Sequence, residues 1–134
     1  MSTTPTINPN PNSDEILALC KDTLGIVVAV QAYLSSPKGL TDSNHDNFFK
    51  LQMILVMEVR RWSGNGIQIA GQGAGAAIDS INHTVDLLKK TIAIRKKISH
   101  DLSIITAFAD LAVSIGTGNP VDIIKNGLAL TNLL

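Results

Sequence analysis

Apolar residues recur every three or four positions along most of the chain, which is the spacing of one face of an α-helix. In the first such stretch, residues 14–35, further apolar residues make more than half of the helix surface apolar. The run Ile26-Val27-Val28 also has strand propensity, but the helical spacing extends well beyond it. Ser13 is placed to cap this helix, and Ser36-Pro37-Lys38-Gly39 ends it because proline and glycine interrupt helices. A helix with so little polar surface is normally central in a bundle.

A second helix is predicted at residues 44–62, with Asp42, Ser43 or Asn44 as its N-cap. One face of this helix is apolar at helical spacing, and further apolar residues lie beside that face. The residues of the apolar face are Phe48, Leu51, Leu55, Val59 and Trp62. Because the polar side is narrow, we expect most of this helix to be covered by other parts of the fold.

Residues 63–77 contain five of the ten glycines, and a glycine inside a helix costs about 1 kcal/mol relative to alanine. We therefore predict a loop or hinge at residues 63–66. For residues 64–77 two interpretations stay open: a loop, or a helix whose small residues four positions apart permit close packing. The segment Gly71-Gln72-Gly73-Ala74-Gly75-Ala76 also matches a phosphate-binding fingerprint, but no strand pair surrounds it and no acid follows at the required distance. No dinucleotide cofactor is therefore expected.

The clearest helix is predicted at residues 76–99, where apolar residues repeat with the 3-4-3-4 spacing of a coiled-coil-like contact. The apolar pattern then continues to Ile115. This continuation is either an extension of the same helix or a separate helix capped by Ser99 or Asp101.

The glycines of Gly116-Thr117-Gly118 end this pattern. The following Asn119-Pro120-Val121-Asp122 predicts a new helix, because it offers an N-cap, a proline at the first helical position and an acid in the first turn. The pattern therefore predicts an all-α fold, a helical bundle of four to five helices formed by residues 13–134 as one domain. Residues 1–12 are expected to be a flexible tail, because three prolines alternate with asparagine and threonine there.

Charge and composition narrow the classes of function. The 134 residues include 11 basic and 11 acidic side chains, so no excess of positive charge directs the chain to nucleic acid. A single cysteine excludes a disulfide framework and a four-cysteine zinc site. The sequence starts without the basic and apolar regions of a signal peptide, and its charge-free stretches at residues 23–37 and 62–78 do not predict a conventional transmembrane helix. We expect a cytoplasmic protein, with peripheral membrane association as a second option.

Few residues suggest chemistry. Asp79, His83 and Asp86 share one helix face and could hold a divalent ion, but no second helix supplies further ligands, so a solvated polar face is expected. Cys20 lies on the apolar face of the first helix without an activating base nearby in sequence, which indicates core packing. We therefore expect no catalytic, cofactor-binding or metal-binding residues and no enzymatic activity.

A basic cluster near the end of the third predicted helix is a candidate for contact with an anion or a lipid headgroup. No aromatic residues interleave with it, so the pattern does not favour nucleic acid, and solvated lysines at a helix end are the expected explanation. The cluster consists of Lys89, Lys90, Arg95, Lys96 and Lys97.

The excess of apolar helix surface indicates a non-enzymatic interaction protein, which self-associates to a homo-oligomer or binds a protein partner. The alternative is a membrane-active helical protein, peripheral or pore-forming, favoured by the glycine-rich segment and the basic cluster. The candidate partner-binding residues are Phe48, Phe49, Trp62, Ile124, Leu128 and Leu133.

Overall fold

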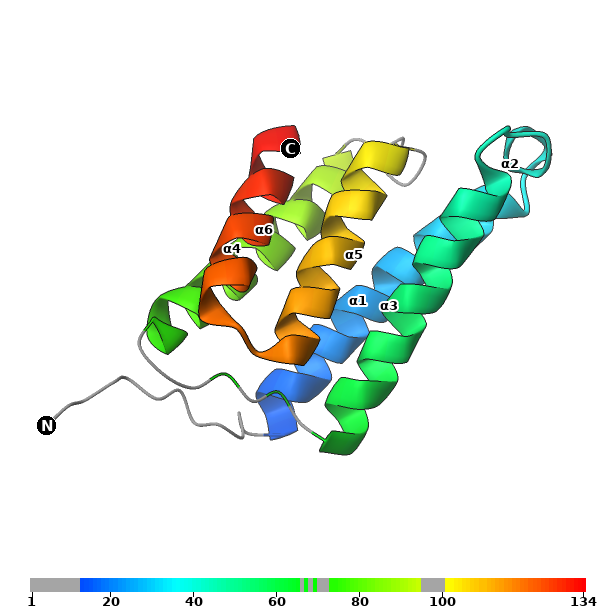
Figure 1. Cartoon of the computed structure of the whole chain (residues 1–134). Coiled ribbons are helices and arrows are strands. Elements are labelled where there is room, and N and C mark those ends of the chain that lie inside the picture. Colours follow the sequence, from blue (N-terminus) through cyan, green and yellow to red (C-terminus); the bar gives the residue numbers. More distant parts are fainter. Residues whose placement is uncertain (1–12, 66, 68, 70–72, 95–100) are drawn as a thin grey trace, which may run out of the picture.

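The computed structural model describes residues 13–65, 67, 69, 73–94 and 101–134, and these residues form six helices and no strand. The fold is all-α, as the sequence pattern predicts (Figure 1). In chain order the helices are α1 (Ser13–Leu34), α2 (Pro37–Leu40), α3 (His45–Asn65), α4 (Ala74–Ile94), α5 (Leu102–Thr117) and α6 (Pro120–Leu133).

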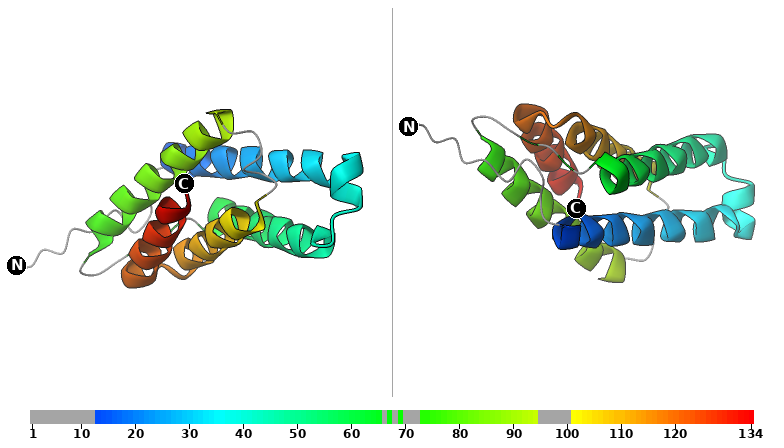
Figure 2. Two further views of the ribbon diagram at one scale, coloured as in Figure 1. Left: turned by 90° about the horizontal axis from the view of Figure 1, so that it is seen from above. Right: turned by 90° about the horizontal axis from the view of Figure 1, so that it is seen from below.

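The helices pack in a ring rather than in chain order. α1 and α3 form an antiparallel hairpin closed by the short α2, and α3 packs on α5, α5 on α6, and α6 on α4. The contact between α4 and α1 that completes the ring is sparse. Seen from above and from below, the end of the hairpin that carries α2 projects beyond α4, α5 and α6 (Figure 2). Part of the hairpin therefore has no neighbouring helix.

Large apolar side chains from all five long helices fill the interior. Tyr33 and Phe48 meet edge to face with their ring centroids 5.6 Å apart, which joins α1 to α3. Ile67 and Ile69, between α3 and α4, are also buried. The largest fully buried side chains are Trp62, Phe48, Phe108, Ile26, Leu55, Ile69, Leu88, Ile104, Ile105, Leu111, Ile115 and Ile123.

Local capping sets the bounds of α5 and α6. The Asp101 carboxylate accepts hydrogen bonds from the backbone N–H groups of Ser103 and Ile104, so α5 is a separate helix with an aspartate N-cap. Gly118 ends α5 in the left-handed region at φ 73°, a conformation that glycine adopts without strain. Asn119 then caps α6 and Pro120 opens it, which confirms the predicted start of the last helix.

The boundaries around the glycine-rich segment differ from the prediction. α3 continues through residues 63–65, where a loop was expected, because the one exposed glycine there, Gly64, costs less near a helix end than the packing of Trp62 gains. Gly73, at φ 93°, directly precedes α4, which begins two residues earlier than predicted. The predicted tail, residues 1–12, and residues 95–99 of the third predicted helix lie outside the described residues. Ser13, the predicted N-cap of the first helix, is already part of α1 in the structure.

Candidate interaction surfaces

Exposed apolar side chains gather on the outer side of the α1–α3 hairpin, and we call this set the hairpin face. On α1 the residues are spaced by seven and four positions, and on α3 by four and four, so each set follows one side of its helix. Val28 and Met57 are exposed to 66% and 59%. The hairpin face consists of Leu17, Leu24, Val28, Phe49, Met53 and Met57.

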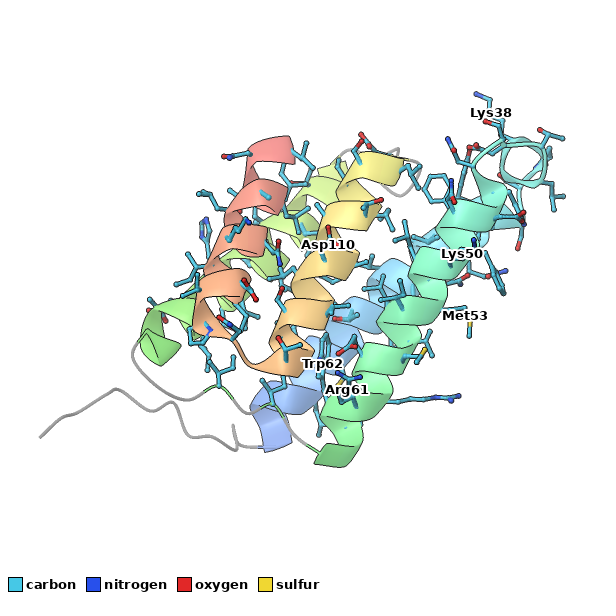
Figure 3. All side chains as sticks on the ribbon, viewed as in Figure 1. Lys38, Lys50, Met53, Arg61, Trp62 and Asp110 are labelled. Carbon is cyan, nitrogen blue, oxygen red and sulfur yellow. The ribbon has the colours of Figure 1, made fainter. Side chains whose placement is uncertain are left out.

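Each stripe of the hairpin face lies opposite to the side of its own helix that packs into the bundle. On α1 the buried side includes Val30 and Tyr33, and on α3 it includes Leu55 and Trp62. A hydrogen bond of 2.8 Å from Gln52 Nε2 to Gln31 Oε1 fixes the alignment of α1 and α3. Met53 points away from the other helices of the bundle (Figure 3).

Among the described side chains around the hairpin face, the exposed charges are mostly positive. Of the side chains that the structure describes on α1, α2 and α3, the exposed acid is Asp46. Asp22 lies on the inner side of α1, where its Oδ1 is 3.1 Å from Lys89 Nζ on α4. The exposed cations on the three helices are Lys21, Lys38, Lys50, Arg60 and Arg61.

A second apolar surface runs along α6, and we call it the α6 face. Val121, Ile124 and Leu128 follow one another by three and four positions and are all exposed, Val121 to 72%. The charged residues of α6 are one acid and one base, Asp122 and Lys125, and both are exposed. α6 therefore carries an exposed apolar stripe and no net charge.

The structure corrects the predicted set of partner-binding residues. Phe48 and Trp62 are both only 1% exposed, because they belong to the side of α3 that packs into the bundle, and they offer no surface to a partner. Phe49 lies on the hairpin face, and Ile124 and Leu128 lie on the α6 face. Leu133 is exposed but lies five residues after Leu128, a rotation of about 140° that turns it away from that face.

The structure describes two residues of the basic cluster, and both are paired. Lys89 pairs with Asp22, and Lys90 Nζ lies 2.9 Å from Asp86 Oδ2. The hydrogen bond and charge of Lys90 lower the pKa of Asp86 below its ordinary value. Arg95, Lys96 and Lys97 lie outside the described residues.

A cleft of about 290 Å³ lies between α1 and α4, where the two helices contact each other sparsely. Two carboxylates, Asp22 and Asp86, line it together with the Asn82 amide and apolar side chains. Both carboxylates are already paired with lysines, so the cleft presents little free charge to a ligand. Within the described part of the chain, no three histidine, cysteine or acidic side chains come close enough to share a metal ion.

Cys20 and the expected polar face behave as the sequence indicates. Cys20 is buried, and its Sγ lies 3.5 Å from Ser63 Oγ on α3. Asp79, His83 and Asp86 are exposed on α4. The cysteine is thus part of the α1–α3 packing, and the α4 residues form a solvated face.

The sequence reasoning did not single out Glu58, a carboxyl group buried in the interface between α3 and α5. Its Oε1 has no hydrogen-bond partner, and its Oε2 is 3.7 Å from Arg61 Nη1. Gly116 on α5 makes room for it, because a Cβ at Gly116 would lie 2.0 Å from Oε1. Burial raises the pKa of Glu58, and the nearby Arg61 opposes this effect only in part.

Replacing this carboxyl, Glu58→Gln, is expected to change the pH dependence of stability. With a raised pKa, Glu58 holds its proton in the folded state at pH values where the unfolded chain has lost it. Stability therefore falls as pH rises from the unfolded pKa through the folded one. The variant has no carboxyl group to ionise and does not lose this stability. The difference in the free energy of unfolding between the variant and the wild type, measured with urea, should therefore grow with pH to about 1 kcal/mol, a typical cost of an unpaired buried polar group.

The exposed carboxyl of Asp110 on α5 supplies the control, as Asp110→Asn. Urea midpoints of the wild type and both variants, measured from acidic to neutral pH, separate the effect of burial from the loss of any acid. A Glu58→Gln advantage that stays constant or shrinks as pH rises contradicts the assignment.

One helix departs from the expectation about membrane spans. The segment Leu17–Leu34 of α1 is long and apolar enough to cross a membrane by length and composition, with a mean hydropathy of 1.5. Buried positions make up 44% of this segment, and α1 packs against α3 and α4 in the bundle. Core helices of soluble proteins meet the same criterion, so the segment alone does not establish a span.

Comparison with known proteins finds no matching family model, no matching curated protein and no matching solved structure. Function therefore has to be inferred from the two exposed faces themselves.

Proposed function

We propose that this chain is a non-enzymatic helical interaction protein that associates with a second copy of itself through the α6 face. The observation that carries the proposal is the exposed stripe of Val121, Ile124 and Leu128. α6 packs on α4 and α5, and the stripe lies on the side left uncovered by these two helices. A contiguous apolar stripe of this kind is typical of a protein-protein interface.

Charge supports a second copy as the partner. In a symmetric dimer the same surface of both copies meets, so an excess of one sign would oppose association. α6 carries one acid and one base, Asp122 and Lys125, so the helix brings no net charge that would oppose the approach of a second copy.

A role in binding rather than catalysis is supported by the cleft between α1 and α4. Its carboxylates, Asp22 and Asp86, are held by Lys89 and Lys90, so neither is free to act as a base or a metal ligand. We also infer a cytoplasmic location, because the sequence shows no signal-peptide pattern and no disulfide framework.

The substitution Leu128→Lys tests the proposal. Leu128 is 59% exposed, so the variant folds with unchanged stability, but a lysine there places an unpaired charge in the interface. We expect the dissociation constant, measured by sedimentation equilibrium over a range of concentrations, to rise by at least about tenfold.

The matched control is Thr106→Lys, which adds the same charge at an exposed position of α5. It is expected to leave the dissociation constant unchanged. A wild type that stays monomeric at every concentration overturns self-association and leaves a different protein as the partner of the α6 face. A dimer that tolerates Leu128→Lys shows instead that association uses another surface.

A further inference from the structure

We propose that the hairpin face docks onto the surface of an anionic lipid bilayer. This inference concerns a different surface from the α6 face and does not depend on self-association. Among its described side chains, the hairpin face combines exposed apolar groups with more exposed cations than exposed acids, and a negatively charged bilayer offers both an apolar interior and complementary charge.

The apolar part of the face suits shallow insertion. Phe49, Met53 and Met57 form a stripe on α3, and Val28 lies on the matching side of α1. The end of the hairpin projects beyond the remaining helices, so the other helices do not hold it away from a flat surface (Figure 2). The buried sides of α1 and α3 stay packed in the bundle, so docking requires no unfolding.

Charge distinguishes a bilayer from a second copy as the occupant. Lys21, Lys50 and Arg60 are exposed beside the apolar stripes, and Asp46 is the exposed acid among the described side chains of the hairpin. Two copies meeting through this face would bring cations against cations, which opposes association. Anionic headgroups attract the same cations, with about 1 kcal/mol for each basic residue near the surface.

Flotation of the full chain with vesicles of phosphatidylcholine, with and without phosphatidylserine, tests the proposal. We expect binding to the vesicles that contain phosphatidylserine and little binding to phosphatidylcholine alone. Lys50→Ala is expected to weaken binding about fivefold, which is the contribution of one basic residue near an anionic surface to the binding constant. The matched control, Lys125→Ala, removes the same charge from α6 and is expected to leave binding unchanged.

A fluorescent label reports which face enters the bilayer. Because Cys20 is buried, a thiol-reactive fluorophore labels the Met53→Cys variant selectively at position 53. The emission of this fluorophore should shift to the blue when anionic vesicles are added. The same label at Ala129→Cys on α6 should not shift. No binding to either vesicle, or equal losses for Lys50→Ala and Lys125→Ala, overturns the proposal.

Both measurements are repeated in the Leu128→Lys background, which separates this inference from the proposed function. Vesicle binding that persists in the variant belongs to the hairpin face alone. Binding that disappears with Leu128→Lys assigns the membrane contact to α6 and contradicts the inference.

Discussion

Replacing Trp62 with alanine is expected to lower the free energy of unfolding by about 3–5 kcal/mol, the range for deleting a buried aromatic side chain. Trp62 is only 1% exposed and is the largest of the fully buried side chains. It lies on the side of α3 that packs into the bundle, so its removal leaves a cavity that neighbouring helices cannot easily fill. This loss is a large fraction of the total, because the free energy of unfolding of such a domain is only about 5–15 kcal/mol.

Urea unfolding followed by far-ultraviolet circular dichroism measures this loss, since the substitution removes the only tryptophan from the chain. Phe49→Ala on the same helix is the control, and because Phe49 is half exposed its loss should stay below about 1 kcal/mol. Equal losses at the two positions would mean that α3 is rotated relative to the arrangement described.

The indole group itself contributes less than its size suggests. Trp62 Nε1 is buried without a hydrogen-bond partner in the structure. Trp62→Phe removes this unsatisfied donor while it keeps an aromatic ring, so it should cost clearly less than Trp62→Ala.

The substitution Gly39→Ala is the second large effect, because α2 folds back tightly on the end of α1. A Cβ at Gly39 would lie 1.8 Å from the backbone oxygen of Tyr33 and 2.9 Å from Leu34 Cα. These are backbone atoms, so the whole turn has to move. Ser36 Oγ accepts a hydrogen bond from Gly39 N, and the turn gives this bond up when it shifts. We expect a loss of about 1–3 kcal/mol or more.

Gly25→Ala is the matched control for this prediction. Gly25 lies in the middle of α1, and a Cβ there would meet no other atom within 4 Å. Alanine is favoured over glycine in a helix interior, so this variant should gain up to about 1 kcal/mol. Urea midpoints of both variants are compared with the wild type. A Gly39→Ala protein as stable as Gly25→Ala would contradict the close approach of α2 to α1.

Local signals in the sequence were sufficient for helix type and for several helix ends. Asn119 and Pro120 predicted the start of α6, and Asp101 was one of two predicted caps for α5. These predictions hold because a cap depends on hydrogen bonds between near neighbours. Gly64 misled the prediction at the end of α3, where packing of the preceding turn outweighs the propensity of one glycine.

The rotation of α3 about its axis could not be predicted with the same success. Phe48 and Phe49 are neighbours, about 100° apart on the helix, and both belong to broadly apolar regions. Only contacts with α1 and α5 decide that Phe48 is buried and Phe49 is exposed.

The α6 face shows a different limit. The sequence prediction named Ile124 and Leu128 but not Val121, and it grouped Leu133 with them although Leu133 lies on another side of the helix. Counting rotations of 100° per residue would have placed it correctly. The pairing of Lys89 with Asp22 was beyond sequence reasoning, because it joins two helices that are far apart in the chain.

The most direct measurement is amide hydrogen exchange of the wild type at low and at high protein concentration. Self-association through the α6 face predicts that exchange in α6 slows as concentration rises, while exchange in α1 and α3 stays the same. Exchange that slows in the α1–α3 hairpin instead, or that does not depend on concentration anywhere, would contradict the assignment of the α6 face as the site of self-association.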